Sequence, residues 1–441
     1  MSRDFSGQLI KGNPLKSILL FAIPIYIGNL FQLTYGLMDT RIIGSILGEA
    51  SLAAVGTTTS FSDFLIEFLN GIACGFGIVI ANYIGAKEKE KVKKAIGVTV
   101  VLGVLITVAI SGICLLLLPQ IMQILNVSES LLPESSAYIR IIIAGLIATT
   151  IFNILTVVLR AIGDSFTPLL FLIVSNVLNI GMDYWFVSIF QRVEGAAIAT
   201  VIAQAISAVC CFLYMKKKYP EILISLNDLR IDKGMCGQLL PQGLSMGVMI
   251  SFVTFGTLAL QTEINNFSTD IIVGHTAARK ITMIFLIPFF ALGTALTTYC
   301  GQNLGAKEYG RIKKGIKDTI LAAFCWSMVA VLVVYTLAPI MVRMITASNE
   351  PEIIRVAVLY LKINSLFFFV PAVICILRNS MQGFGDTKTP LVSSFIELVG
   401  KIVIAIFLVP AIGYMGVIVS EPVVWIIMVV PLLLGMKKRK L

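Results

Sequence analysis

The sequence is poor in charge and in the residue types that catalytic and metal sites use. Only 13% of its 441 residues are Asp, Glu, Lys or Arg, whereas about a quarter of a soluble globular protein is charged. It has 1 histidine, and its 8 cysteines form no C-x-x-C pair, so neither a disulfide framework nor a metal site is predicted. No Ser/His dyad, paired-Asp motif or cluster of metal-spaced histidines is present. We therefore do not expect an enzyme.

What the sequence has in abundance is apolar residues in long runs. Hydrophobic residues make up 57% of the chain, and apolar runs of about 20 residues, each long enough to cross a bilayer, recur along its whole length. The runs are continuous and do not alternate with polar residues, which predicts helices. We predict an all-α polytopic membrane protein with about twelve transmembrane helices in two pseudo-symmetric six-helix lobes.

The net charge of +10 does not indicate a nucleic-acid partner. The Lys and Arg residues lie in short loops between the apolar runs and in the two tails, where the positive-inside rule accounts for them. An even number of spans puts both termini on one side, and the basic tails and alternate basic loops place that side in the cytoplasm. We expect a multi-pass protein of the cell membrane whose surroundings are the lipid bilayer.

Two spaced motifs recur in the same order in the two halves of the chain. The Gly-Ala-Lys motif at residues 85–87 returns at 305–307, and the Gly-Asp-x-x-Thr-Pro motif at 163–168 returns at 385–390. Both offsets are about 220 residues, half the chain. Six spans per half is an even number, so the halves run in the same direction, and parallel repeats around a cleft are a transporter architecture.

The repeat predicts three regions along the chain. They are an amino-terminal lobe at residues 1–215, a cytoplasmic linker at 216–237 and a carboxy-terminal lobe at 238–441. No G-x-x-x-x-G-K-[ST] motif is present, which excludes a P-loop nucleotide motor. Transport is therefore expected to be secondary.

One apolar run carries polar side chains on a single face. Asn176, Asn179 and Asp183 are spaced i, i+3 and i+7, so they share one side of a helix. A carboxylate in the hydrocarbon core costs about 3 kcal/mol or more unless it faces a cavity or a partner. The stretch therefore predicts a small hydrated site where a proton or another cation rests.

These features together resemble the multidrug and toxic compound extrusion (MATE) transporters. The resemblance rests on residues 39–44 at the end of the first run, the twin loops and turns, Asn179-x-x-x-Asp183, and the segments 195–197 and 301–303. It implies a twelve-helix, two-lobed exporter that exchanges H⁺ or Na⁺ for small organic, often cationic, compounds by alternating access. The coupling ion is the only cofactor implied, and we expect a monomer.

The resemblance also implies a site in the amino-terminal lobe. Its proton- or cation-coupling residues are Asp39, Asp183 and Asn179, and Pro24 matches the point where the family's first helix bends. The expected supporting polar residues are Tyr138, Asn153, Asn176 and Thr200. A rise of 1.5 Å per residue places Asp183 about 10 Å and Thr200 about 8 Å inside the outer ends of their spans, with Tyr138 close to that end.

The carboxy-terminal lobe does not repeat this acid. The repeat offset carries Asp183 onto Ala405, whereas Glu397 and Lys401 stand i, i+4 on the eleventh run and are expected to pair. Two interpretations stay open for this pair, an ion pair that fixes helix packing and a role in moving substrate or ions. Gln261 and Asn265 on the seventh run are expected to line the cleft.

Other functions fit the sequence less well. A flippase for lipid-linked oligosaccharides or lipids, from the same superfamily, is the main alternative, but it would need extra spans and an arginine-lined cavity, and arginine is sparse within the runs. A channel is disfavoured because the polar groups collect at one level instead of lining a continuous path.

Overall fold

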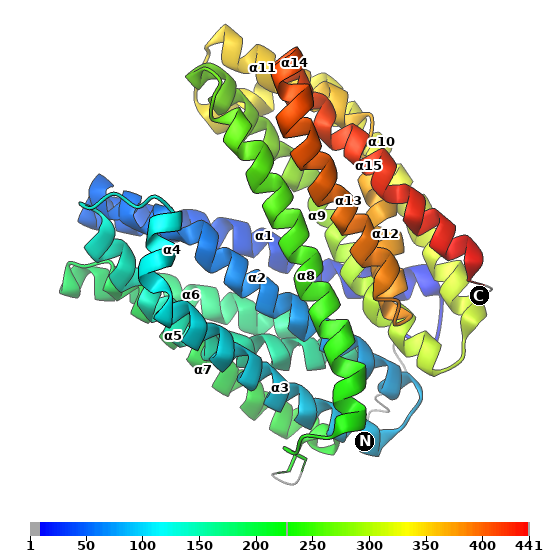
Figure 1. The fold of residues 1–441 in the computed structure, drawn as a ribbon. Coiled ribbons are helices and arrows are strands. Elements are labelled where there is room, and N and C mark those ends of the chain that lie inside the picture. The colour runs from blue at the N-terminus through cyan, green and yellow to red at the C-terminus, as the bar shows by residue number, and fades with distance from the viewer. Residues whose placement is uncertain (1–8, 226–227, 440–441) are drawn as a thin grey trace. The chain divides into compact units, whose positions relative to one another are not determined.

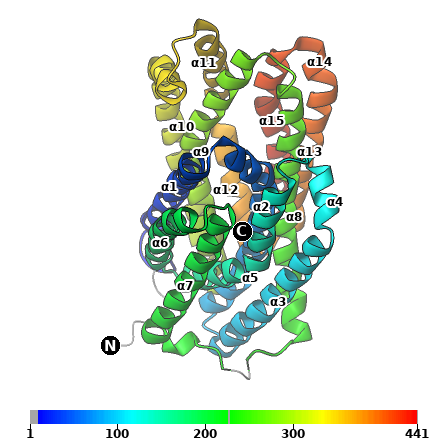
Figure 2. The ribbon, with the colours of Figure 1, turned by 90° about the vertical axis from the view of Figure 1, so that its left-hand side faces the viewer.

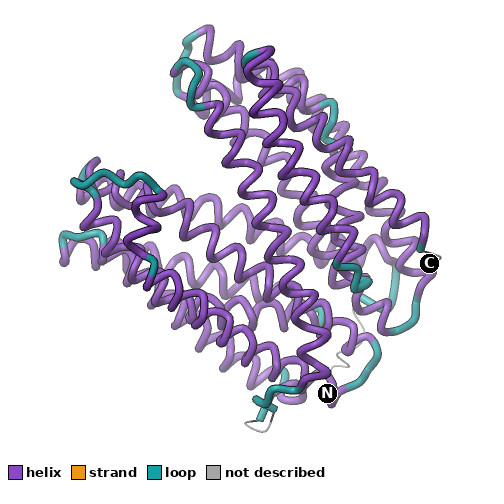
Figure 3. Tube along the Cα trace, viewed as in Figure 1, coloured by secondary structure: helices purple, strands orange, loops and turns teal. Residues whose placement is uncertain are grey.

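The computed structural model describes residues 9–225 and 228–439, apart from the side chains of residues 34, 35 and 37, and all its regular structure there is helical (Figures 1 and 3). The first half contains α1 (Pro14–Leu47), α2 (Glu49–Gly85), α3 (Lys89–Leu116), α4 (Leu118–Ile124), α5 (Leu132–Ala161), α6 (Phe166–Phe190), α7 (Glu194–Lys218) and the 3₁₀ turn η1 (Pro220–Ile222). The second half contains α8 (Lys233–Ile264), α9 (Thr269–Gly305), α10 (Tyr309–Thr346), α11 (Pro351–Ser365), α12 (Phe369–Gly383), α13 (Lys388–Val403), the π-helical turn η2 (Ile404–Leu408), α14 (Val409–Ile412) and α15 (Tyr414–Lys438).

The spans agree with the predicted membrane fold. In the described part of the chain, 11 helices are long and apolar enough to cross a membrane, and α11 with α12 makes a twelfth span that is bent by 55°. Pro371 lies in the first turn of α12, where a residue without an N–H is tolerated but cannot continue a preceding helix. The all-α polytopic prediction is confirmed, and its tenth span is a broken one.

Packing divides the described residues into two compact units, and the first helix of each half contributes to both. The first unit holds Ile23–Gly247, and the second holds Leu9–Ala22 together with the chain from Val248 onward. Thus α1 begins in the second unit and continues in the first, whereas α8 begins in the first unit and continues in the second. The division of the sequence at residues 216–237 stays a prediction.

Specific contacts fix these two helix starts. In the second unit, Arg311 donates from Nε to Oδ1 of Asn303 at 3.0 Å and from a terminal nitrogen to the Gly12 carbonyl at 2.7 Å, just before α1. In the first unit, the Tyr83 hydroxyl donates to Oε1 of Gln238 on α8 at 2.7 Å. A Cβ on Gly75 would lie 2.4 Å from a carbonyl oxygen of α8, so this close approach of α2 and α8 requires glycine.

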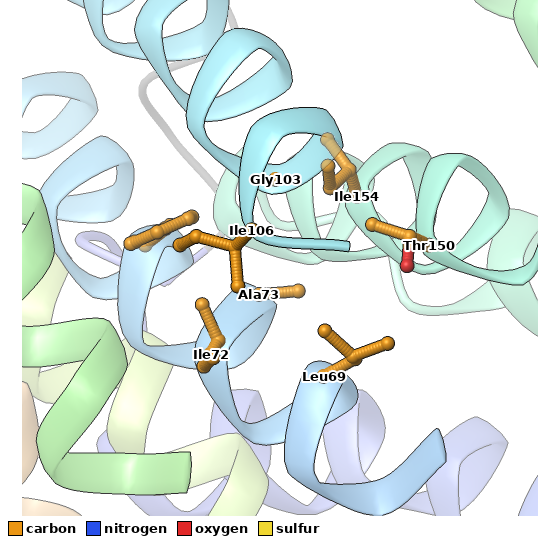
Figure 4. Close-up of a pocket in the computed structure, with 8 residues that line it drawn as sticks. Leu69, Ile72, Ala73, Gly103, Ile106, Thr150 and Ile154 are labelled. Atoms are coloured by element: carbon orange, nitrogen blue, oxygen red, sulfur yellow. The ribbon is translucent and has the colours of Figure 1, made fainter. Parts of the chain in front are cut away.

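The interior of the first unit is filled with apolar side chains. One void of about 10 Å³ lies between α2, α3 and α5. Figure 4 shows that Leu69, Ile72 and Ile106 are among its walls. Such a volume holds one water at most, so this void is a packing defect and no place for a substrate.

The repeated Gly-Asp-x-x-Thr-Pro motif folds into the same turn twice. Gly163 has φ +94° and Gly385 has φ +78°, a backbone conformation that L-residues with a side chain rarely adopt. Asp164 accepts hydrogen bonds from the backbone N–H (2.9 Å) and the hydroxyl (2.7 Å) of Thr167. In the second turn, Asp386 accepts both from Thr389, at 3.1 and 2.9 Å. Each aspartate thereby satisfies the first turn of the next helix, α6 or α13.

Each of these aspartates also binds a basic residue at the end of the last helix of its half. Nζ of Lys218, at the end of α7, lies 3.0 Å from Oδ2 of Asp164, and a guanidinium nitrogen of Arg439, just after α15, lies 3.4 Å from Oδ2 of Asp386. The Tyr219 hydroxyl donates to Asp164 as well. Burial alone would raise the pKa of Asp164, but the hydrogen bonds from Thr167, Tyr219 and Lys218 bring it below the usual value.

We expect Asp164→Asn to lower the stability of the protein by about 2 kcal/mol near neutral pH, because it removes charge-assisted hydrogen bonds. Since the folded-state pKa is lowered, the carboxylate's contribution is present above the ordinary pKa of about 3.9 and is lost as the pH falls through the folded value. Thermal unfolding of the purified protein measures this, with Asp318→Asn as the control. A difference between wild type and Asp164→Asn that does not shrink below about pH 4 would contradict the assignment.

Candidate functional site

The register of two parallel helices places Asp39 beside Asp183. A Cβ on Gly28 of α1 would lie 3.2 Å from the Leu172 side chain of α6, so the two helices are in close contact there. Asp39 follows Gly28 by eleven residues, and Asp183 follows Leu172 by eleven. Eleven residues are about three turns, so each acid lies on the same face as the contact and three turns beyond it. The two carboxyl groups lie within hydrogen-bonding reach of each other.

Asp183 is enclosed by α6 and its neighbour α7, which lie side by side in Figure 2. The Asp183 side chain is fully buried, and Asn179 is 4% exposed. Nδ2 of Asn179 donates to Oδ1 of Asp183 at 3.2 Å and to the Thr200 hydroxyl oxygen at 3.3 Å. The amide therefore fixes the Asp183 carboxyl against α7.

The site is rich in acceptors and poor in donors. Oδ1 of Asp39, Oδ2 of Asp183 and Oδ1 of Asn179 are buried and accept no hydrogen bond from any described protein group. Ionised carboxylates only accept hydrogen bonds, so Asp39 and Asp183 bond to each other only when one of them holds a proton. These oxygens therefore suit a shared proton or a hard cation.

Tyr138 of α5 belongs to the same group of residues. It is 8% exposed, and its phenol lies within electrostatic reach of Asp39, Asp183 and also Asp63 of α2. Asn153 and Asn176 differ: neither amide has a hydrogen bond to the two acids in the described part of the chain, and Nδ2 of Asn176 is buried without a partner. The structure thus brings five of the seven predicted polar residues together.

These groups lie at one level across four helices. Counted at 1.5 Å per residue, their distances from the nearest helix end are all about 9–12 Å. Asp39 and Asp183 are counted back from the last residues of their helices, Leu47 and Phe190. Tyr138 and Thr200 are counted forward from the first residues of theirs, Leu132 and Glu194. Tyr138 lies deeper than the sequence predicted because α5 begins at Leu132.

The second unit contains a network of five charged side chains, of which Glu397, Lys401 and Glu421 are buried. The pair predicted at Glu397 and Lys401 is present on α13, with Nζ of Lys401 2.9 Å from Oε1 of Glu397. Lys401 also lies 3.4 Å from Glu421 of α15 and 3.3 Å from the Thr257 hydroxyl of α8.

Two arginines complete this network. Arg279 of α9 lies 2.9 Å from Oε1 of Glu421, and Arg378 of α12 lies 3.8 Å from Oε2 of Glu397. Three cations and two carboxylates give the cluster a charge of +1 when all are ionised. The cluster connects four helices, α9, α12, α13 and α15, which favours the packing interpretation of the Glu397–Lys401 pair.

Sequence reasoning did not find Arg378 or Glu421 as members of this network. The available signal was a charge within an apolar run, but such a charge does not show which other helix it faces. The predicted cleft residues Gln261 and Asn265 hydrogen-bond to each other at 2.9 Å and have no described bond to the network. Their cleft role stays a prediction.

We expect Lys401→Met to destabilise the protein by about 3–5 kcal/mol, because it leaves buried carboxylates without their shared cation. The double variant Lys401→Met/Glu397→Gln removes a charge of each sign and should recover part of that loss. Thermal unfolding of both variants measures the effect. A double variant that is less stable than Lys401→Met alone would contradict the ion-pair assignment.

Comparisons with known proteins agree with this architecture. A family model described as MatE matches residues 24–185 and 245–407, two segments whose starts are 221 residues apart (245 − 24), close to the offset of the sequence repeat. The probable multidrug resistance protein YpnP of Bacillus subtilis is 25% identical over 389 residues, 88% of this chain and 86% of that protein. The multidrug export protein MepA of Staphylococcus aureus is 22% identical over 413 residues, 93% of this chain and 90% of that protein.

Solved structures share the fold. One, described as the outward-facing conformation of a multidrug resistance MATE family transporter of the MOP superfamily, superposes with a TM-score of 0.88 at 23% identity and covers 98% of this chain and 97% of its own. A MATE structure in the bent conformation has a TM-score of 0.89 at 22% identity, with 99% of this chain and 98% of its own covered.

Members of the family are transporters and not enzymes, which confirms the prediction that this chain is not an enzyme. Because the family model matches most of the sequence in two repeats, this chain belongs to the MatE family of multidrug and toxic compound extrusion transporters.

Proposed function

We propose that this chain is a secondary active exporter that exchanges H⁺ or Na⁺ for small organic compounds, often cationic, across the cell membrane. Relatives that carry the names multidrug export or multidrug resistance protein support the substrate class. The basic loops and tails support an orientation with both termini in the cytoplasm. The protein works as a monomer in this proposal, and the coupling ion is its only cofactor.

The observation that carries the proposal is the pair of Asp39 and Asp183, in which Asp183 is fully buried and Asp39 is half-buried. An isolated charge within the membrane costs several kcal/mol, and intramembrane acids that persist mark ion or substrate pathways. Two carboxyl groups this close do not both stay ionised unless a cation lies between them. The pair therefore holds a proton or binds a cation when it is sealed from water, and releases it when water enters.

Coupling follows from the positions of these acids on different helices. Asp183 is fixed on α6 by Asn179, whereas Asp39 lies on α1, the helix that begins in the other compact unit. A movement of α1 changes the separation of the two carboxyl groups and therefore their affinity for the ion. Binding of the ion therefore favours one conformation of α1, and a change in the conformation of α1 changes the affinity for the ion.

Pro24 removes one backbone hydrogen bond from α1, so α1 bends most easily at this residue. It lacks the N–H that would bond to the carbonyl four residues earlier, and it lies two residues past the point where α1 passes from the second compact unit to the first. Bending there moves Asp39 while the start of α1 stays held by Arg311.

We expect Asp39→Asn and Asp183→Asn each to abolish gradient-driven export, because a carboxamide neither gains nor loses the coupling proton and lacks the charge that holds a cation. Efflux of the fluorescent cation ethidium is measured in inverted membrane vesicles, with a proton gradient and a sodium gradient imposed separately. Glu134→Gln, an exposed acid at the start of α5, is the control and should export at the wild-type rate. Full activity of either aspartate variant, at equal protein levels in the membrane, would refute the proposal.

The same vesicles test the flippase alternative. An exchanger moves ethidium only when at least one of the two gradients is imposed, and reversal of that gradient reverses the direction of movement. Ethidium movement that continues with neither gradient present would favour the flippase alternative over the proposed exchange.

We expect Pro24→Ala to slow export severalfold while substrate binding stays close to that of wild type, because alanine restores the missing hydrogen bond and stiffens α1. Pro288→Ala, which changes a proline inside α9, is the matched control. Turnover is measured in the vesicles, and ethidium binding is measured by fluorescence with purified protein. An unchanged turnover in Pro24→Ala would show that bending at this residue is not part of the cycle.

A further inference from the structure

A basic pocket opens at one end of the second compact unit, and its lining includes none of the residues of the charged network. Its volume is about 430 Å³, and its walls come from α10, α12, α15 and the residue that follows α15. The cationic lining residues are Lys313, Lys317, Lys437 and Arg439. Because α10 begins and α15 ends here, the pocket lies where the helices leave the membrane.

Three of the four cations are available to a ligand. Lys313, Lys317 and Lys437 are exposed, and none forms an ion pair with a described residue. Arg439 is held in place by Asp386, at 3.4 Å, and by the ring of Phe384, whose centroid is 5.4 Å away. The lining contains no acid, so the pocket has an uncompensated positive charge.

The rest of the lining is apolar, and it continues from the cations towards the middle of the membrane. The remaining lining residues are Ile316, Ile320, Leu377 and Met436. At 1.5 Å per residue, Lys313 lies about 6 Å and Ile320 about 16 Å from the start of α10. Lys317, about 12 Å from that start, is the last cation on this wall, so the lining changes from charged to apolar within about 5 Å beyond it, as a phospholipid does from its phosphate to its acyl chains.

The length of α10 places this change at the membrane surface. Its 38 residues extend about 57 Å, whereas the hydrocarbon core is about 30 Å thick. The excess length leaves room for the first turns of α10, which contain Lys313 and Lys317, in the headgroup region, with Ile320 at the top of the hydrocarbon.

We propose that this pocket binds an anionic membrane phospholipid, with the phosphate and headgroup between Lys317 and Lys437 and one acyl chain along Ile320 and Leu377. Basic pockets between transmembrane helices at the membrane surface have the chemistry that holds such headgroups. A soluble phosphate would use the cations but would gain nothing from the apolar wall, and a zwitterionic lipid would use the wall but not the charge. The proposal is independent of the coupling ion, of the exported compound and of the orientation in the membrane.

The test uses the full-length protein in detergent with mixed micelles of phosphatidylglycerol and phosphatidylcholine, and native mass spectrometry counts the lipids that stay bound. The variant Lys317→Gln/Lys437→Gln removes two cations from the pocket. The control Lys314→Gln/Lys438→Gln removes the same charge from neighbouring exposed positions of α10 and α15 that do not line the pocket. Thermal unfolding verifies that both variants are folded.

We expect wild type and the control to retain phosphatidylglycerol in preference to phosphatidylcholine. The pocket variant should bind phosphatidylglycerol about thirtyfold more weakly, which is the effect of two lysines near an anionic lipid surface. An equal loss in both variants would show general attraction to positive charge and would overturn the proposal. Equal retention of phosphatidylcholine, or displacement of the lipid by inorganic phosphate alone, would overturn it as well.

Discussion

The cost of placing charge inside an apolar helix bundle governs the arrangement of this protein. In the first unit, a fully buried Asp183 is acceptable only because Asn179 donates to one oxygen and the Asp39 carboxyl lies next to it. That pair still has more acceptors than donors, and the deficit is what a proton or a cation corrects. In the second unit, Glu397 and Glu421 are compensated by three cations of the protein itself. The two units thus differ in how their buried charges are balanced, and only the acid pair of the first unit lacks cations of the protein among its described partners.

The internal repeat is preserved at the turns that hold helices together and lost at the acid pair. Both Gly-Asp turns cap the next helix through a threonine, and both aspartates bind a basic residue at the end of the last helix of their half. The starts of α1 and α8 follow the same plan, since each packs in one compact unit before the helix continues in the other. The acid at Asp183 has no counterpart: the equivalent position is Ala405, which lies in the π-helical turn that interrupts the span after α13.

Much of the fold could be predicted from the sequence, because hydropathy and helix length act locally. The apolar runs predicted the spans, and the spaced motifs predicted the twin turns and six spans in each half. The contact of Asp39 with Asp183 was predicted only through family resemblance, and the structure explains it by a helix register that composition does not contain. Arg378 and Glu421 were not assigned partners, since the rotation of one helix against another depends on packing. The break before Pro371 was also missed, although a proline within a span was visible.

In the proposed exchange, ion occupancy of the pair of Asp39 and Asp183 is linked to substrate export, so binding of substrate should release the ion. The most direct test is to count the ions that the purified protein releases when it binds ethidium. Proton release is measured by calorimetry in buffers of different ionisation enthalpy. Release of Na⁺ is measured by displacement of radioactive sodium. We expect wild type to release one of the two ions and Asp39→Asn/Asp183→Asn to release neither. Release of the same number of ions by that double variant would contradict it.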